Sequence, residues 1–144
     1  MRRPTVRVMS ALFALVIPAL GAAGCGTDPI TNDSSSTSPS ILITETYTGT
    51  VAVGGAAVFS FGVNGTGNVT GTYKSISPDS GVAMGISLGI WNGSACSVVV
   101  ANDNAFVNST VIGAATASGT LCVRAYDIGK LTATQTVEIS VTHF

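Results

Sequence analysis

Charged side chains are scarce in this sequence, and their scarcity excludes one class of partner. Only 9% of the 144 residues are Asp, Glu, Lys or Arg, whereas about 25% is usual in globular proteins. Arg2, Arg3 and Arg7 account for half of the six basic residues, and the rest of the chain holds three basic residues against seven acidic ones. Because a nucleic-acid-binding domain needs a basic patch, we expect no nucleic acid among the partners.

The residue types that perform catalysis are also nearly missing. The sequence has a single histidine, His143, one residue from the C-terminus, where fraying is the default expectation. No G-x-S-x-G motif, no H-E-x-x-H motif and no paired-carboxylate arrangement occurs. A catalytic base or nucleophile needs a partner residue, so the sequence predicts a protein without enzymatic activity.

Amphipathic helical patterns are absent after the first 24 residues, and the remaining composition is typical of strands and turns. Glycine is abundant, with 17 residues, and the frequent Val, Thr and Ser favour β-structure. The clearest pattern is in residues 82–91, where apolar residues alternate with small ones and finally with Trp91. A period of two predicts a half-buried strand. The face expected to be buried carries Val82, Met84, Ile86, Leu88 and Ile90.

Turn signals divide residues 41–144 into about eight strands. Asn64-Gly65 and Asn92-Gly93 are typical of hairpin turns, and Asn102-Asp103-Asn104 is expected to end a strand. Short strands at regular spacing predict one all-β domain, an antiparallel β-sandwich that is jelly-roll-like. The expected strands are 44–53, 58–63, 69–76, 82–91, 95–101, 106–117, 120–126 and 134–142.

Residues 1–24 have the three parts of an export signal, namely a basic start, an apolar stretch that we expect to be helical, and a small-residue exit. Cys25 follows directly, and the run 20–25 resembles a bacterial lipobox, in which the cysteine becomes the lipidated first residue of the mature chain. The alternative is an ordinary signal peptide cut after Ala22 or Ala23, which leaves Cys25 as a free thiol.

Residues 25–40 are dominated by Ser, Thr, Asp, Asn and Pro, which is typical of a flexible tether. A lipid anchor followed by a tether predicts an exported protein of the bacterial cell envelope. The predicted partner of the anchor is the membrane. Without lipidation of Cys25, the protein would instead be secreted.

Cys96 and Cys122 are the only cysteines after the leader, and we expect them to form a disulfide that pins two strands. Export places the domain where a disulfide persists. Two thiols without a nearby histidine make an incomplete metal site. Redox catalysis is not expected either, because the sequence has no C-x-x-C motif. The predicted role of this pair is therefore structural.

Calcium is the one metal for which the sequence offers ligands. Asn102, Asp103 and Asn104 supply side-chain oxygens, and Asp127 follows another strand. Calcium prefers six to eight oxygen ligands. The alternative is that these residues bond to the backbone of their own turns, and we favour it, so no cofactor is expected unless calcium binds.

Trp91 is the candidate ligand-binding residue. It points away from the main apolar face of its predicted strand, and an exposed aromatic ring beside small polar groups suits a glycan. The alternative is that a lone tryptophan in a sandwich packs against a loop or a disulfide.

Three segments resemble the bacterial pre-peptidase C-terminal domain. They are Glu45-Thr46-Tyr47-Thr48-Gly49, Phe59-Ser60-Phe61 and the strand 119–127, and the resemblance covers roughly residues 43–142. It implies a jelly-roll-like β-sandwich without enzymatic activity. Such domains accompany secreted peptidases and other extracellular enzymes, where they are thought to aid secretion, attachment or substrate binding, and related collagen-binding domains carry calcium.

Together these observations predict a non-catalytic envelope lipoprotein whose β-sandwich binds a surface, a glycan or a protein. A second hypothesis is a structural or assembly subunit that packs through its neutral strands. A third is an accessory module that acts with a separately encoded secreted peptidase.

Overall fold

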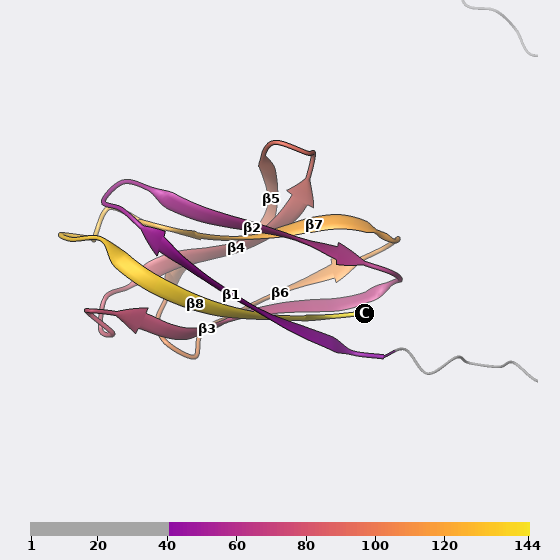
Figure 1. Ribbon diagram of the computed structural model, residues 1–144, viewed down its shortest axis with the longest axis horizontal. Helices are drawn as coiled ribbons and strands as arrows, with labels where there is room; N and C mark the ends of the chain where they lie inside the picture. The colour runs from indigo at the N-terminus through magenta and orange to yellow at the C-terminus, as the bar shows by residue number, and fades with distance from the viewer. Residues whose placement is uncertain (1–40) are drawn as a thin grey trace, which may run out of the picture. The chain divides into compact units, whose positions relative to one another are not determined.

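The computed structural model describes residues 41–144 (Figure 1). The predictions of a helical signal peptide, of lipidation at Cys25 and of a tether over residues 25–40 all fall outside the described residues. Within residues 41–144 the secondary structure is entirely β, with eight strands, as predicted. In this same part of the chain, no helix is long and apolar enough to cross a membrane.

The strands agree with the predicted segments to within a few residues. They are β1 (Ile43–Val51), β2 (Ala56–Val63), β3 (Gly67–Ser77), β4 (Met84–Trp91), β5 (Cys96–Ala105), β6 (Thr110–Ala115), β7 (Gly119–Tyr126) and β8 (Gln135–His143).

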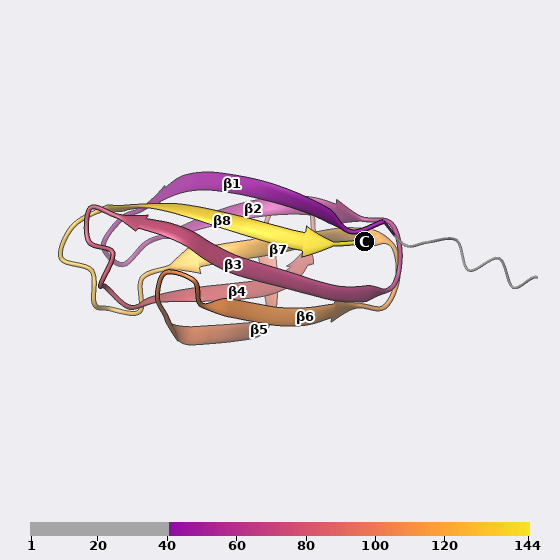
Figure 2. The same ribbon diagram turned by 90° about the horizontal axis from the view of Figure 1, so that it is seen from below.

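The strand order confirms the predicted jelly-roll sandwich. Strands β1, β8, β3 and β6 form one antiparallel sheet, and β2, β7, β4 and β5 form the other, so that the two sheets lie face to face (Figure 2). β1 pairs with β8, β2 with β7, β3 with β6, and β4 with β5. The domain is therefore one long hairpin, bent at the β4–β5 turn and rolled into two sheets, which is the architecture of an eight-stranded jelly roll.

Period-two alternation builds the core between the two sheets. In β8, every second residue is buried, beginning with Gln135 and ending with His143. β4 contributes Met84, Ile86 and Leu88 from the other sheet, all buried as predicted. Each of these strands turns one apolar face towards the opposite sheet. Burial of the two facing apolar surfaces therefore drives the sheets together.

Three local expectations are wrong. Asn102-Asp103-Asn104 does not end a strand, since β5 continues to Ala105 and a β-bulge accommodates the extra residues opposite β4. Ile90, expected to be buried, is 56% exposed and lies one residue from the end of β4, beyond a second register shift with β5. His143 is not frayed: it pairs with Ile43 and is buried.

All three tyrosines of the chain have hydroxyl groups that meet a protein acceptor. Tyr73 donates to the carbonyl of Gly85 at 2.7 Å, Tyr126 donates to Asp103, and Tyr47 donates to Glu45. Burial raises the pKa of Tyr126 to about 12, and the bond to Asp103 adds to this rise. Burial also raises the pKa of Tyr47 and Tyr73 above the usual value for tyrosine.

We therefore expect the folded protein to form little tyrosinate at about pH 10, where free tyrosine is half ionised. Because the folded-state pKa values exceed the unfolded value, the stability from these groups is complete below about pH 10 and is lost as the pH rises towards the folded values. Ultraviolet absorbance titration of the native protein, with the urea-unfolded protein as control, measures the ionisation. Coincident native and unfolded titration curves would contradict the raised pKa values of these tyrosines.

Candidate ligand-binding site

The predicted disulfide between Cys96 and Cys122 is present, and it joins strands that are not neighbours. Cys96 begins β5, Cys122 lies in β7, and β4 runs between these two strands. Their Cα atoms are 5.8 Å apart. In the register of the sheet, Gly89 of β4 pairs with Cys122 on one side and with Val98 on the other. The disulfide therefore passes over β4 at Gly89.

Gly89 is the residue that permits this crossing. A methyl group on its Cα would collide with the backbone carbonyl of Ser97, which is part of β5. A collision with backbone cannot be relieved by rotating a side chain, so only glycine allows β5 to fold this closely over β4.

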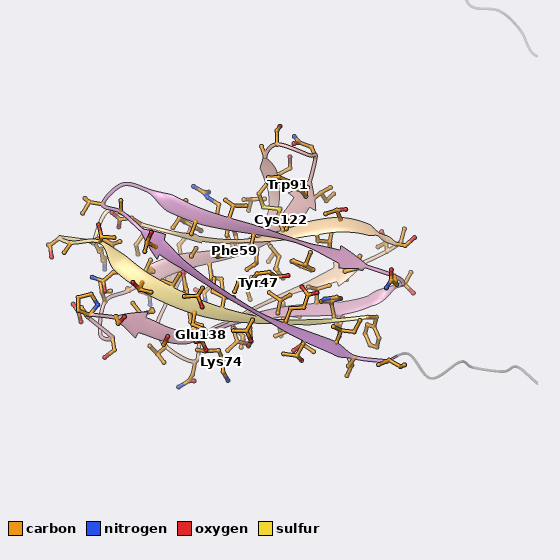
Figure 3. The ribbon with its side chains drawn as sticks, viewed as in Figure 1. Tyr47, Phe59, Lys74, Trp91, Cys122 and Glu138 are labelled. Carbon is orange, nitrogen blue, oxygen red and sulfur yellow. A yellow bond between two sulfur atoms is a disulfide. The ribbon has the colours of Figure 1, made fainter. Side chains whose placement is uncertain are left out.

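Beyond the crossing, the end of β4 and the start of β5 form a projecting hairpin, residues 89–98, which we call the β4–β5 tip. Figure 1 shows this tip rising from the sandwich, and Figure 3 labels Trp91 on it and Cys122 at its base. The turn is closed by Asn92, whose side-chain oxygen accepts N–H bonds from Ser94 at 3.0 Å and Ala95 at 2.8 Å. Gly93 has a φ of 97°, a conformation that favours glycine.

A cleft of about 500 Å³ lies against the β4–β5 tip. It is lined by residues 88–91 of β4, 99–100 of β5, 113–121 of the β6–β7 hairpin and Val69 of β3. This volume falls in the range of about 300 to 1,000 Å³ that is usual for ligand pockets. None of the described residues that line the cleft is charged, so the cleft suits a neutral ligand.

Trp91, the residue predicted to bind a ligand, is half-buried and forms part of the wall of this cleft. Trp91 also pairs in register with Cys96. It therefore lies beside the disulfide as well, as the alternative prediction has it. Thr116, Ser118 and Thr120, whose side chains carry hydroxyl groups, also line the cleft. The site therefore combines one aromatic ring, apolar surface and a few hydroxyl groups.

Sequence reasoning missed the largest continuous part of the cleft lining. Residues 113–119 read Gly-Ala-Ala-Thr-Ala-Ser-Gly, a run of small residues that begins inside the expected strand 106–117 and continues past its end. Small side chains leave the space that becomes the cleft. The compositional signal was present, but nothing in the sequence placed this run in one cleft with Trp91.

The four predicted calcium ligands lie in two places. Asp127 follows β7, where one side-chain oxygen accepts the N–H of Gly54 and the other accepts those of Gly129, Lys130 and Leu131, at 2.8 to 3.1 Å. The N–H of Gly54 contributes most to lowering the pKa of Asp127, and the other three act in the same direction. Asp127 thus ties the β1–β2 turn to the β7–β8 loop.

The other three candidates, Asn102, Asp103 and Asn104, lie in β5. The side-chain oxygen of Asn102 accepts the N–H of Asn104 at 3.1 Å, and Asp103 accepts the hydroxyl of Tyr126, whose ring also lies 4.6 Å from the guanidinium carbon of Arg124. Among the described residues there is no group of three or more His, Cys, Asp or Glu side chains that could hold a metal. Calcium binding therefore stays the alternative to the favoured prediction, in which these residues bond to the backbone of their own turns.

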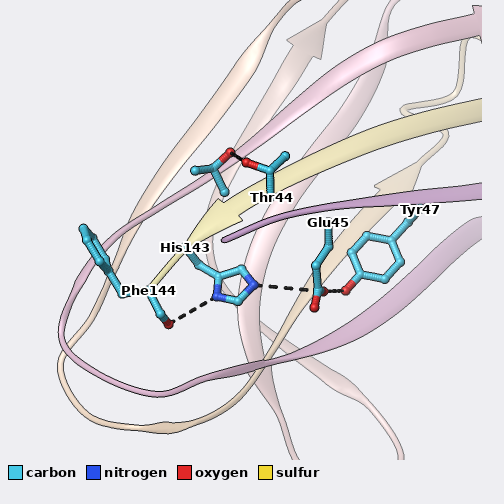
Figure 4. Close-up of polar contacts among 6 residues, drawn as sticks. Thr44, Glu45, Tyr47, His143 and Phe144 are labelled. Carbon is cyan, nitrogen blue, oxygen red and sulfur yellow. Dashed lines mark hydrogen bonds and ion pairs between the residues drawn. The ribbon is translucent and has the colours of Figure 1, made fainter. Parts of the chain in front are cut away.

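His143 is buried beside a partly exposed polar cluster at the end of β8 (Figure 4). Its Nε2 is 4.0 Å from a carboxylate oxygen of Glu45, and its Nδ1 is 3.2 Å from the carbonyl oxygen of Phe144. Its ring packs 5.2 Å from that of Phe61. The imidazole thus fills space between β1, β2 and β8.

No protein-family model matches the chain, and no curated protein is similar to it. The resemblance to the pre-peptidase C-terminal domain therefore stays a prediction.

Proposed function

We propose that this domain is a non-catalytic binding module that holds a neutral sugar against Trp91 in the cleft beside the β4–β5 tip. The observation that carries this proposal is the position of Trp91, half-buried in the wall of an uncharged cleft. An aromatic ring offers a flat apolar surface for the C–H face of a sugar. The hydroxyl groups of Thr116, Ser118 and Thr120 are the kind of polar group that orients a ligand in a mostly apolar pocket.

The predicted N-terminal region fits this role. A lipid anchor at Cys25 and a tether up to residue 40 would display the jelly roll at the surface of a bacterial envelope. A module held in this way needs no catalytic residues, because attachment is the function.

The sugar proposal has a built-in reporter, because Trp91 is the only tryptophan of the chain. Tryptophan fluorescence of the purified protein is measured during titration with neutral hexoses, N-acetylhexosamines and their oligomers. We expect a saturable change with at least one of these sugars. Light scattering of the same samples tests the alternative function. Saturable self-association without any response to sugar would support an assembly subunit, which the exposed Val98 and Val99 on edge strand β5 favour.

Replacement of Trp91 by alanine is expected to weaken sugar binding at least about tenfold, which corresponds to about 1.4 kcal/mol, because the stacking surface is lost. Calorimetry measures the affinity, since this variant lacks the fluorescent reporter. Phe106→Ala is the matched control: it removes a partly exposed aromatic side chain that does not line the cleft. Equal affinity of the Trp91→Ala protein and the unmodified protein would refute the assigned site.

A further inference from the structure

Trp91 is paired with a neighbouring strand on one side only. The last pair that β4 forms with β7 is Ile90 with Leu121. One residue further on, Trp91 pairs with Cys96 of β5 and with nothing on the β7 side. The position of Trp91 therefore depends on where the start of β5 is fixed.

Two features fix the start of β5. The disulfide binds Cys96 to Cys122, which is fully buried in the middle of β7. Gly89 lets the backbone at Ser97 lie directly on β4, so the disulfide can reach across that strand. Apolar packing contributes little at this point, because Ile90 and Val98 are both largely exposed.

We infer that Gly89 and the Cys96–Cys122 disulfide are the positioning elements of the cleft, so that the redox state of this cysteine pair controls ligand binding at Trp91. The part of this inference that concerns ligand affinity rests on the proposed function. The part that concerns the position of Trp91 does not.

The chemistry is a two-electron reduction. A dithiol reductant gives two electrons and two protons to the S–S bond, which breaks into the thiols of Cys96 and Cys122, and the reductant closes into its own cyclic disulfide. Cys96 is half-buried whereas Cys122 is fully buried, so the sulfur of Cys96 is the accessible one. After reduction, the β4–β5 tip is held by the β4–β5 ladder and its turn alone.

The first test needs no ligand. Emission and acrylamide quenching of Trp91 are compared in the oxidised protein, the dithiol-reduced protein and the Cys96→Ala/Cys122→Ala variant, with far-ultraviolet circular dichroism to follow the sandwich. We expect reduction to shift the emission to longer wavelength and to increase quenching, and the double variant to behave like the reduced protein. Unchanged emission and quenching after complete reduction would overturn the inference.

A second pair of variants keeps both cysteines. Gly89→Ala places a methyl group against the Ser97 carbonyl, and we expect it to shift Trp91 emission while the disulfide is intact. Gly62→Ala is the matched control, because a methyl group at Gly62 in β2 would meet nothing within 4 Å. If reduction unfolds the whole domain, the comparison of the two glycine variants still tests the inference. Trp91 emission that is identical in the Gly89→Ala and Gly62→Ala proteins would overturn it.

The last measurement is sugar affinity in the oxidised and reduced states. We expect reduction to weaken sugar affinity at least about tenfold. The Cys96→Ala/Cys122→Ala variant should show the same weak affinity without reductant, and reductant should not change it. A shift of Trp91 emission without binding of any sugar would leave the positioning role intact and refute the proposed function. Equal sugar affinity in both redox states would refute the redox control of binding.

Discussion

Replacement of both Cys96 and Cys122 by alanine is expected to lower the free energy of unfolding by about 3 to 4 kcal/mol. The two cysteines are separated by 26 positions, and the cross-link restricts the unfolded chain over that distance. Alanine is chosen because Cys122 is fully buried, and the hydroxyl of a serine there would need a hydrogen-bond partner. Urea denaturation followed by circular dichroism measures the change.

Two results would show that the cross-link itself is responsible. Reduction of the unmodified protein should give a loss of similar size, and reductant should leave the stability of the double variant unchanged. The slope of the unfolding free energy against urea should rise in the double variant, because an unfolded chain without the cross-link exposes more surface. A loss below about 1 kcal/mol would contradict the chain-entropy account of this disulfide.

The disulfide also shows how far the sequence could lead. Two cysteines in a domain with a predicted export signal were enough to predict the bond, because oxidising compartments favour pairing and no rival chemistry fitted. That the bond spans three strands and passes over Gly89 could not be predicted. In the sequence, Gly89 is one more small residue in the alternation of 82–91, and only the register with Cys122 and Val98 reveals why glycine is needed there.

The jelly roll itself was predictable as a class but not as a set of partners. Alternation such as Val137, Ile139 and Val141 identifies a strand with one buried face, and regular turns identify an antiparallel sandwich. The pairing of β1 with β8 joins residues that lie almost a hundred positions apart, and local patterns carry no information about such contacts. The same holds for the cleft, which Trp91 lines together with the remote run 113–119.

The failed predictions for Asn102 to Asn104 and for His143 have one cause in common. In both places, pairing with a distant strand fixed a structure that the local sequence did not predict. Asn102 and Asn104 suggested a turn, and the side-chain oxygen of Asn102 does accept the N–H of Asn104, but the ladder with β4 accommodates these residues as a bulge. His143 suggested a frayed terminus, yet pairing with Ile43 and packing against Phe61 hold it inside. A terminal strand that docks into a sheet is ordered by its partners, whatever its position in the chain.

Replacement of Tyr73 by alanine is expected to destabilise the domain by about 3 to 5 kcal/mol, the range for removing a large buried aromatic side chain. Tyr73 is fully buried in β3 and is among the largest such side chains of the core. Its hydroxyl donates to the carbonyl of Gly85 in β4 at 2.7 Å, so one side chain both fills the space between the sheets and bonds them to each other. Urea denaturation measures the loss.

Two phenylalanine variants separate packing from hydrogen bonding. Tyr73→Phe keeps the ring but leaves the Gly85 carbonyl without this donor in a buried place, so we expect a loss of about 1 to 3 kcal/mol. Tyr47→Phe removes a hydroxyl that bonds to the partly exposed Glu45, and there water can replace the lost bond, so the loss should stay below about 1 kcal/mol. If both variants lose equally little, the sheets are held together at Tyr73 by apolar contact alone, and the bond to Gly85 contributes nothing to the joining of the two sheets.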